Sequence, residues 1–313
     1  MKEYVLSYYP QFKCIAEKCQ HTCCAGWEMK IDSQTLNAYK NQKSLFSQTL
    51  DKGINYKKSK FKSDKKGRCA FLNDKGLCEI IINLGEQSLC QVCRDHPRFR
   101  SFFNDRTETG LGFCCEQATK IILSYKDKIQ PVLTHYDENE NQLDFNQTNV
   151  LEFRQKALDL IQDRNVDINR RIENLLTLCK ANVLEKNYKQ IIKTFLSFER
   201  LNKNWTSRLK SIKNQTFNKT VDNSQAIYCE QFITNGIYRH LSNAQDTMWV
   251  RAITIGLILC WWIINNIIKK EQNSNTPDFN LIVDVVRAYS AEVEYSENNL
   301  YKLYNFAYKF IKL

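Results

Sequence analysis

The stretch CIAEKCQHTCCAGW (residues 14–27) decides how the first part of the chain folds. Four cysteines fall within eleven positions, two of them adjacent, and Gly-Trp follows. Ten of the thirteen cysteines precede residue 116: Cys14, Cys19, Cys23, Cys24, Cys69, Cys78, Cys90, Cys93, Cys114 and Cys115. Such a set is typical of a disulfide-bonded knot, a metal site or a corner built from small buried side chains.

The cellular compartment bears on this choice. The first residues, MKEYVLSYYPQFK (1–13), lack the apolar run and the small-residue cleavage site of a secretory signal. We therefore expect a cytoplasmic protein, in which structural disulfides are rare and clustered cysteines act as metal ligands or redox groups. The 313 residues, 43% hydrophobic and 25% charged, are typical of a globular protein with one large domain or two ordinary ones.

The formal charge of +11 at pH 7 raises the question of an anionic partner. The chain has no arginine-rich tract and no zinc-finger spacing of the C-x2-C…H-x3-H kind, so we expect no nucleic-acid partner. The most apolar stretch, AITIGLILCWWII (252–264), is too short to cross a bilayer. Arg251, Asn265 and Asn266 flank it, and we predict a buried core helix without membrane insertion.

The cysteine spacings favour a metal centre. On a helix, Cys19 and Cys23 share a face at i, i+4, and Cys90 and Cys93 meet at i, i+3. The adjacent Cys23 and Cys24 project in different directions, so we do not expect both to bind one ion. Thiolates suit zinc, Cu(I) and iron–sulfur clusters, and a structural zinc or a [4Fe-4S] cluster takes four of them. The first part of the chain has ten cysteines, more than two such centres need, so the sequence allows either one or two metal centres.

Local patterns place these cysteines on short elements. IDSQTLNAYK (31–40) predicts a helix start capped by Asp32 or Ser33. RCAFLNDKGLCEI (68–80) predicts two strands around a turn at 73–76. With a two-residue loop, Phe71 lies opposite Cys78, and Cys69 and Cys78 share one face as diagonal neighbours. Pro97 ends a short helix that carries the later C-x2-C pair.

Charged residues follow that pair in CRDHPR (93–98). Arginines near thiolates lower thiol pKa values, and Arg94 and Arg98 are also suited to hold a carboxylate by paired hydrogen bonds. The alternative is that they cap a helix end and pair with nearby acids. The sequence does not decide whether His96 is a metal ligand, a catalytic base or a surface residue.

The second half has helical periodicity from about Val150 onward. We predict helices over 225–241, 249–269, 281–291 and 299–311, and a polar linker over about 210–225. Cys179, Cys229 and Cys260 lie among apolar neighbours and are expected to be small buried side chains. The fold class is therefore mainly α. A cysteine-rich, metal-binding region with short strands (1–125) precedes an all-helical domain (126–313).

Several ordered blocks resemble the bacterial flagellin lysine-N-methylase family. They are FKCIAEKCQHTCCAGWEMKID (12–32), GRCAFLNDKGLCEIIINLGEQSLCQVCRDHPR (67–98) and GLGFCCEQA (110–118). EQFITNGIYRHL (230–241) and FNLIVDVVRAYSAEVEYSENNL (279–300) match more loosely. The first half also resembles a wider class of small domains with C-x-x-C-x-x-C-C patterns, which are thought to chelate zinc or iron.

The resemblance implies methyl transfer from S-adenosylmethionine to lysine ε-amines on flagellin, which makes the protein a protein-lysine N-methyltransferase with flagellin as its partner. It also implies a [4Fe-4S] cluster held by these cysteines, with zinc as an alternative or a companion. The family tends to have proline at the position of Cys115, so Cys115 is left out of the ligand set. The candidate ligands are Cys14, Cys19, Cys23, Cys24, Cys69, Cys78, Cys90, Cys93 and Cys114. The family often has histidine at the position of Tyr295, so no role is transferred to that residue.

The sequence shows no usual site for S-adenosylmethionine. Gly110-Leu111-Gly112 is the only G-x-G, it lacks a third glycine, and no βαβ pattern surrounds it. The C-x3-C-x2-C motif of radical enzymes is also absent. We therefore expect an unusual site. Trp27 is a candidate for an aromatic contact with the sulfonium, and Arg94 and Arg98 are candidates to hydrogen-bond the carboxylate.

Methylation of lysine requires loss of a proton, because less than about one lysine in a thousand is neutral at pH 7. By proximity in sequence, the candidate proton acceptors are Asp95, His96 and Glu116. Two other functions stay open. The excess of thiols is compatible with a zinc- or iron-binding protein without catalysis, and the adjacent Cys23 and Cys24 with a thiol redox sensor. The sequence does not predict the oligomeric state.

Overall fold

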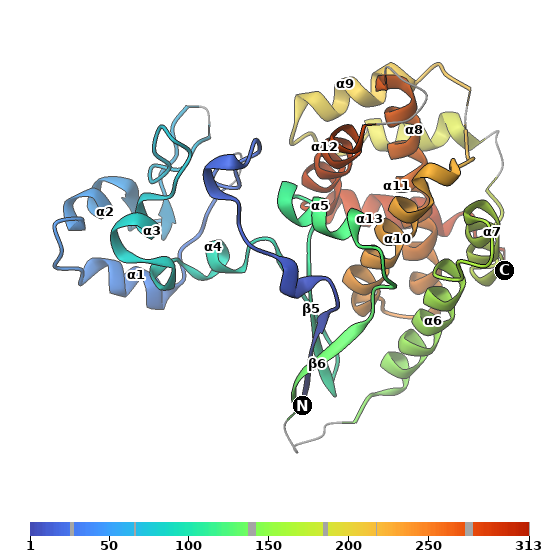
Figure 1. The fold of residues 1–313 in the computed structure, drawn as a ribbon, viewed down its shortest axis with the longest axis horizontal. Helices are drawn as coiled ribbons and strands as arrows, with labels where there is room; N and C mark the ends of the chain where they lie inside the picture. Colours follow the sequence, from blue (N-terminus) through green and yellow to red (C-terminus); the bar gives the residue numbers. More distant parts are fainter. Residues whose placement is uncertain are drawn as a thin grey trace. The chain divides into compact units, whose positions relative to one another are not determined.

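The computed structural model describes residues 1–25, 28–65, 67–136, 142–183, 187–216, 218–272 and 278–312, with Glu17 described by its backbone alone. Thirteen α-helices and six β-strands lie in this described part, and the predicted mainly α fold is confirmed (Figure 1). The chain divides into two compact units. We call Lys13–Arg98 the cysteine-rich unit, and Met1–Phe12 together with Phe99–Leu313 the helical unit.

This division differs from the expected boundary at 125/126. The N-terminal strand β1 (Lys2–Leu6) pairs with strands that follow the cysteine-rich unit, and this pairing carries residues 1–12 into the helical unit. Helix α5 (Glu116–Ser124) packs against two later helices, α10 (Ala226–His240) and α12 (Phe279–Tyr289). Long-range strand pairing and helix packing therefore set the boundary, and neither can be predicted from a local sequence pattern.

The cysteine-rich unit consists of short elements. They are η2 (Ala16–Lys18), α1 (Ser33–Lys40), α2 (Ser47–Gly53), β2 (Ile54–Asn55), β3 (Lys60–Phe61), α3 (Glu79–Leu84), η3 (Glu86–Ser88) and α4 (Gln91–Asp95). Its small core contains aromatic rings, and those of Phe61 and Phe71 meet edge to face with centroids 5.2 Å apart. Two cysteines, Cys69 and Cys90, are fully part of this core.

Local predictions in this unit have mixed outcomes. Asp32 caps α1 by accepting the Thr35 N–H at 2.9 Å, and α4 ends before Pro97, as predicted. The register around Cys78 was predicted wrongly, because Leu72 and not Phe71 pairs with it in an isolated bridge. The Asn73 side chain accepts the N–H groups of Lys75 and Leu77, both at 3.0 Å, and so holds a longer turn than two residues.

The helical unit begins with a four-stranded sheet in the order β4-β5-β1-β6. Its strands are β4 (Arg98–Phe102), β5 (Arg106–Leu111), β1 and β6 (Pro131–Tyr136). Strand β1 runs parallel to β5, with Lys2 opposite Arg106, and antiparallel to β6. The remaining elements are helices: α5, α6 (Phe145–Ile161), α7 (Ile168–Leu178), α8 (Tyr188–Leu196), α9 (Lys203–Ile212), α10, α11 (Thr247–Glu271), α12 and α13 (Glu297–Tyr308).

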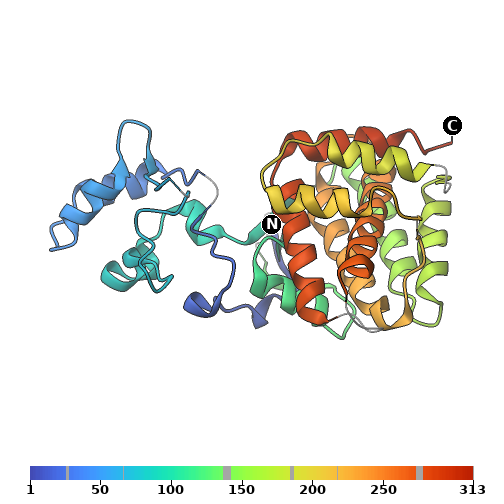
Figure 2. The same ribbon diagram turned by 90° about the horizontal axis from the view of Figure 1, so that it is seen from above.

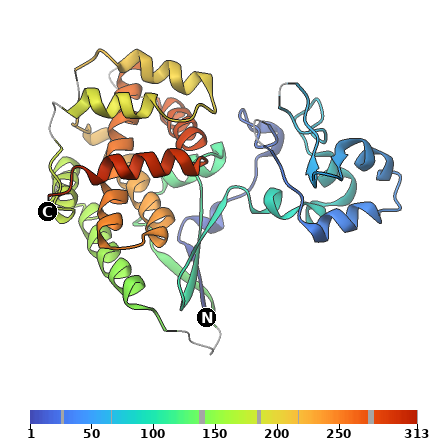
Figure 3. The same cartoon turned by 180° about the vertical axis from the view of Figure 1, so that it is seen from behind.

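Helix α11 lies at the centre of the helical unit. It packs against α10, α12 and α13, as well as α6, α7 and α9. Figure 2 shows α11 (orange) surrounded by other helices, and Figure 3 shows α13 (dark red) crossing it. Among the described helices, α11 alone is long and apolar enough to cross a membrane, but 78% of its apolar window is buried inside the protein. This confirms the predicted core helix.

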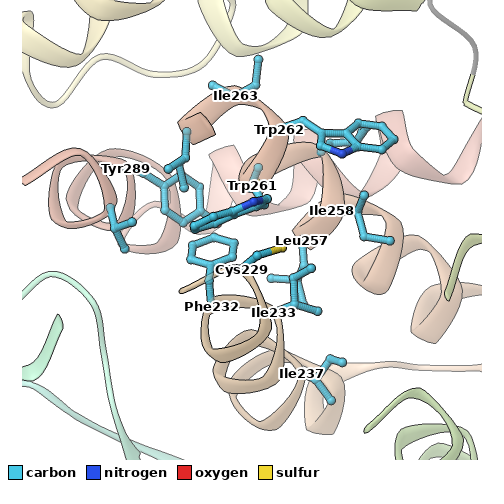
Figure 4. Close-up of a cluster of buried hydrophobic side chains, with 14 of the residues drawn as sticks. Cys229, Phe232, Ile233, Ile237, Leu257, Ile258, Trp261, Trp262, Ile263 and Tyr289 are labelled. Carbon is cyan, nitrogen blue, oxygen red and sulfur yellow. The ribbon is translucent and has the colours of Figure 1, made fainter. Parts of the chain in front are cut away.

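The core around α11 is aromatic. Phe232 on α10 lies 5.4 Å from both Trp261 and Tyr289, measured between ring centroids (Figure 4). Cys229 and Cys260 are buried among these side chains, as predicted. The helices predicted over 225–241, 249–269, 281–291 and 299–311 correspond to α10, α11, α12 and α13.

The polar linker predicted over about 210–225 is different in the structure. Helix α9 extends to Ile212, and Val221 is buried. The Asn169 side chain donates to the Val221 carbonyl at 3.0 Å and accepts its N–H at 2.8 Å. This polar stretch, of which Phe217 is not described, is therefore a connection fixed to the helical unit and not a boundary between domains.

Candidate metal centre

Three separate chain segments bring five cysteines together in the cysteine-rich unit. Cys24 and Cys69 are joined by their backbones, since the Cys69 N–H donates to the Cys24 carbonyl at 2.7 Å. Cys78 is the N-cap residue of α3, and Cys90 is the N-cap residue of α4 with Cys93 one turn later. Cys69 and Cys90 belong to the core, and the other three pack against it. We call these five residues the thiol group.

Electrostatic interactions connect the thiol group. Burial raises the pKa of Cys69 to about 12, and the charges of Cys24, Cys78 and Cys90 add to this effect. Burial also raises the pKa of Cys78, again with a contribution from Cys24 and Cys90. Deprotonating one thiol therefore disfavours deprotonating the next. A bound cation removes this mutual repulsion, because it replaces the protons with its own charge.

Cys24 is one of two thiols in the group whose ionisation the surroundings favour. A hydrogen bond from the Cys23 thiol, outweighing the effect of burial, lowers the pKa of Cys24 to about 7. The Thr22 hydroxyl and the positive charge of Arg68 act in the same direction. Cys23 and Cys24, expected to point apart, are thus in contact through their side chains.

Cys90 and Cys93 form a hydrogen-bonded pair across the first turn of α4. The Cys93 thiol donates to Cys90, which lowers the pKa of Cys90 and raises that of Cys93. The i, i+3 spacing predicted this approach. The Cys90 thiol also contacts the Lys30 carbonyl, with sulfur and oxygen 3.8 Å apart. Helix α4 therefore presents two thiols in hydrogen-bond contact, of which Cys90 is the easier to ionise.

The donors of the thiol group fit a thiolate-binding metal in number and in chemistry. Five sulfurs exceed the four that a structural zinc or a [4Fe-4S] cluster takes. Across the described residues, no three or more His, Cys, Asp and Glu side chains are already arranged to hold a single ion. The number and type of the donors do not choose between zinc and an iron–sulfur cluster.

The other predicted ligands lie apart from these interactions. The exposed Cys14 sulfur accepts the Ala16 N–H at 3.4 Å, and the Cys19 thiol donates to the His21 carbonyl at 3.3 Å. Cys114 belongs to the helical unit, where burial raises its pKa to about 12 and a hydrogen bond from Tyr295 lowers it. Their roles as ligands stay predictions.

The structure describes two of the three residues predicted to bind S-adenosylmethionine. Arg94 is exposed on α4 and donates to the Gln91 side chain at 3.1 Å. Arg98 donates to the Arg94 carbonyl at 3.0 Å. Trp27 lies outside the described residues. The positive charge that lowers the pKa of Cys24 is that of Arg68, which the sequence did not single out.

The predicted proton acceptors each have a described contact. The Asp95 carboxylate accepts from the Gln91 side chain at 2.6 Å, and the backbone N–H of His96 donates to the Val92 carbonyl at 3.2 Å. Glu116, buried in the first turn of α5, forms an ion pair with Lys120 at 2.7 Å. Asp95 and His96 belong to the cysteine-rich unit and Glu116 to the helical unit. Their catalytic roles stay predictions.

A second polar cluster in the helical unit was not predicted. Arg239 and His240, at the end of α10, contact the Glu294 carboxylate at 2.9 and 3.1 Å, and Ser290 donates to it. Burial raises the pKa of Glu294, but Arg239 and His240 outweigh it and lower the pKa to about 2. Ser290–Glu294 is a π-helical turn, a feature often found at functional sites.

This cluster reaches the surface at Tyr295. The ring of Tyr295, 48% exposed, lies over the Arg239 guanidinium at 5.2 Å, and its hydroxyl donates to Cys114. The only signal for it in the sequence was the position of its members. Arg239 and Glu294 lie in the two C-terminal blocks that match the family loosely, and these blocks meet in the structure.

Comparison with known proteins supports the resemblance. The chain is 25% identical over 171 residues to two proteins named lysine-N-methylase, from Salmonella typhimurium and Salmonella choleraesuis. The match covers 51% of this chain and 42% of each relative, so the chain spans less than half of their length. It is also 26% identical over 138 residues to the flagellar biosynthetic protein FliU of Salmonella muenchen, covering 41% of this chain and 82% of FliU.

No protein-family model matches the chain, and no solved structure matches it. Two of the matched proteins share the name lysine-N-methylase, and all three come from Salmonella. They support the resemblance that the cysteine blocks predicted: over about half of its length, this chain is similar to Salmonella proteins named lysine-N-methylase.

Proposed function

We propose that the protein is an S-adenosylmethionine-dependent methyltransferase that acts on lysine side chains of flagellin in the cytoplasm. Two relatives are named lysine-N-methylase, and a third is named a flagellar biosynthetic protein. The observation that carries the proposal is the thiol group. Three of the matching sequence blocks are rich in cysteine, and two of them supply all five of its sulfurs.

We assign a [4Fe-4S] cluster to the thiol group, with zinc as the alternative. The thiol group supplies one sulfur more than such a cluster takes. One of its five sulfurs therefore either does not bind the cluster or exchanges with one that does. The hydrogen bond from Cys23 lowers the pKa of Cys24 to about 7, so its thiolate forms readily near neutral pH. A bound cluster would supply Lewis-acidic iron or a structural staple for short elements that have only a small core.

The chain itself must position two reactants and move one proton. The target amine must be neutral to attack the methyl group, so a residue of the protein has to accept its proton. Asp95, His96 and Glu116 are the proposed acceptors. Positioning of amine and methyl accounts for much of the rate in such transfers, because no covalent intermediate with the protein is required.

Methyl transfer is tested with the full chain, reconstituted anaerobically with iron and sulfide and incubated with flagellin and labelled S-adenosylmethionine. We expect label on flagellin lysines, located by peptide mass spectrometry. Cys69→Ser is expected to lose both the bound iron and the transfer, since Cys69 lies inside the thiol group. Cys115→Ser is the matched control, because Cys115 belongs to the helical unit and is outside the set of candidate ligands. A fully loaded protein that transfers no methyl group to lysine would falsify the proposal.

The Cys90–Cys93 pair favours a second function. A C-x-x-C pair at a helix N-terminus with one lowered pKa is the arrangement of dithiol redox proteins. Cys90 is completely buried, however, which restricts its access to an oxidised partner. Titration of thiols after exposure to oxidant decides between the functions. Loss of two thiols per chain, restored by a reductant, supports the redox function, and protection of these thiols by bound metal supports the metal centre.

A further inference from the structure

The short strands of the cysteine-rich unit carry a concentration of positive charge. Residues 28–62 contain eight lysines and no arginine, against three acidic residues, a net charge of +5. Nearly half of the net charge of +11 thus lies in a small part of the chain. A surface on which one sign of charge is concentrated attracts partners of the opposite sign.

Strand pairing aligns several of these lysines. Strand β3 pairs with β2 on one side, and on its other side Lys60 forms an isolated antiparallel bridge with Lys30. Beside this bridge, the Phe61 N–H donates to the Met29 carbonyl at 3.1 Å. Residues directly opposite each other on antiparallel segments have side chains on the same face. Lys30 and Lys60 therefore share one face.

The other face of the same segments belongs to the core. Three side chains that alternate with the lysines are buried there: Met29, Ile31 and Phe61. These apolar side chains fix the register, because a shift by one residue would exchange the two faces. Lys62 follows Lys60 by two residues and is exposed, so it lies on the outward face with Lys30 and Lys60.

One carboxylate lies among these lysines. Glu28 forms an ion pair with Lys60, and the hydrogen bond from Lys60 holds the pKa of Glu28 below its usual value. The charges of Lys60, Lys30 and Lys58 act in the same direction, so three ammonium groups lie around one carboxylate. Lys30 is also directly opposite Lys60, and like charges in this position destabilise paired strands. We call Lys30, Lys58, Lys60 and Lys62 the lysine face.

The lysine face has more positive charge than its own carboxylate neutralises. Among the described residues, Lys60 is the one member that has an ion pair. The Lys62 ammonium donates to the Lys52 carbonyl at 2.7 Å, a neutral group that leaves the charge in place. Lys30, Lys58 and Lys62 are exposed. An anionic partner on this face would therefore relieve the repulsion between the lysines.

The composition of the lysine face favours carboxylates over nucleic-acid phosphates. Arginine, the residue that binds phosphate through paired hydrogen bonds and stacks on aromatic rings, is absent from residues 28–62. Surfaces that bind single-stranded nucleic acid also offer aromatic rings for base stacking. The ring of Tyr56, close to the face in the sequence, instead lies under the Lys40 ammonium, 5.7 Å from the ring centroid, and its hydroxyl donates to Asp51 at 2.9 Å.

We propose that the lysine face binds an extended acidic segment of the protein substrate. This role rests on the proposed function, and it narrows the substrate class to lysines that have Asp or Glu nearby in the sequence. A target lysine is itself cationic, so acidic neighbours are needed for it to approach a positively charged unit. Lys60 and Lys62 are about 7 Å apart along their strand, the spacing of alternate side chains in an extended peptide.

Peptide binding tests the lysine face without relying on catalysis. The probe is a fluorescent peptide of about twelve residues that alternates Glu and Ser around a central Lys, and its counterpart has Gln in place of every Glu. Fluorescence anisotropy with the anaerobic, metal-loaded full chain measures both dissociation constants. We expect the acidic peptide to bind at least about 10-fold more tightly at about 50 mM salt, and this preference to shrink at about 500 mM, because salt screens exposed charges.

A triple variant, Lys30→Gln with Lys58→Gln and Lys62→Gln, removes three charges and keeps the pair between Lys60 and Glu28. It should weaken binding of the acidic peptide by about 10-fold, as the loss of several exposed charge contacts predicts. The control is a second triple variant with the same change in net charge, made at exposed lysines of α8 and α9 in the helical unit: Lys189→Gln, Lys193→Gln and Lys203→Gln. It should leave binding unchanged. Circular dichroism checks that both variants are folded.

Three results would overturn the lysine face as a site for acidic protein segments. The first is equal weakening by the two triple variants, which would show an effect of net charge alone. The second is equal affinity of the wild type for the acidic and the Gln-containing peptide. The third is a single-stranded oligonucleotide of the same charge that binds more tightly than the acidic peptide and depends on the same three lysines, which would make the face a nucleic-acid surface.

Docking and methyl transfer can fail separately. If both hold, the triple variant of the lysine face should raise KM for flagellin by about 10-fold and leave kcat within about twofold, because it removes binding that substrate and transition state share. Methyl transfer with an unchanged KM removes the lysine face and leaves the proposed function. Acidic-peptide binding that depends on the face, in a loaded protein that transfers no methyl group, leaves the surface and removes the proposed function.

Discussion

Arg239 donates to Glu294 across 2.9 Å inside the helical unit, although 55 residues separate them in the sequence. The Glu294 side chain is almost fully buried, and His240 and Ser290 contact the same carboxylate. A buried carboxylate is tolerated only when it is paired and hydrogen-bonded, and Glu294 meets both conditions. The pair joins α10 to the π-helical turn that precedes α13.

Glu294→Gln should therefore destabilise the helical unit by about 3–5 kcal/mol, because it leaves the buried Arg239 charge without its partner. Urea denaturation followed by circular dichroism measures the change in the free energy of unfolding. Glu173→Gln is the control, since its pair with Arg170 is exposed on both sides and should contribute less than about 1 kcal/mol. Equal effects of the two substitutions would contradict the importance of the buried pair.

The same carboxylate should make stability depend on pH in a defined window. Arg239 and His240 outweigh burial and lower the pKa of Glu294 to about 2, whereas its unfolded value is about 4.5. The unfolded chain then binds the proton more readily, so the stabilisation is complete above about pH 4.5 and is lost as pH falls toward 2. The stability difference between the wild type and Glu294→Gln should shrink over this window. A difference that stays constant from pH 5 to pH 3 contradicts the assignment.

Gly53 is predicted to be essential for packing in the cysteine-rich unit. A Cβ atom at this position would lie 2.3 Å from Cζ of Phe71, whose ring is completely buried. Gly53→Ala should therefore destabilise this unit by about 1–3 kcal/mol through overpacking. Thermal unfolding measures the loss. Combining Gly53→Ala with Phe71→Leu should cost less than the sum of the two single changes, and strict additivity would show that the two sites do not meet.

Features determined by local chemistry could be predicted from the sequence. The Asp32 cap, the end of α4 before Pro97 and the buried helix over 252–264 each depend on residues within one or two turns. The register at Cys78 failed because the Asn73 side chain holds two N–H groups and lengthens the turn. The prediction assumed a two-residue loop, and the hydrogen bonds of the Asn73 side chain stabilise a longer one.

Features determined by distant contacts could not be predicted. Strand β1 has five residues and no strong alternation, and its pairing with β5 is a contact across about a hundred residues. Arg239 and Glu294 are charged residues on helices, which usually indicate a solvent-exposed face. The spacing of the cysteines predicted the Cys90–Cys93 pair. The convergence of Cys24, Cys69 and Cys78 on it depends on how several short helices and strands between them pack, which spacing does not give.

The last prediction links folding of the cysteine-rich unit to the metal centre proposed for it. Asp32 caps α1 and also accepts the Gln91 N–H, one residue after Cys90. Asp32→Ala should cost about 1–2 kcal/mol as a lost cap, and it should also speed the release of bound metal, because α4 loses its attachment to α1. Metal release to a chelator, followed by absorbance, measures the rate. Asp144→Ala is the control, since Asp144 caps α6 in the helical unit by accepting the Gln147 N–H at 2.7 Å. It should cost similar stability and leave the rate of metal release unchanged, whereas equal acceleration by both variants would show that general destabilisation causes the release.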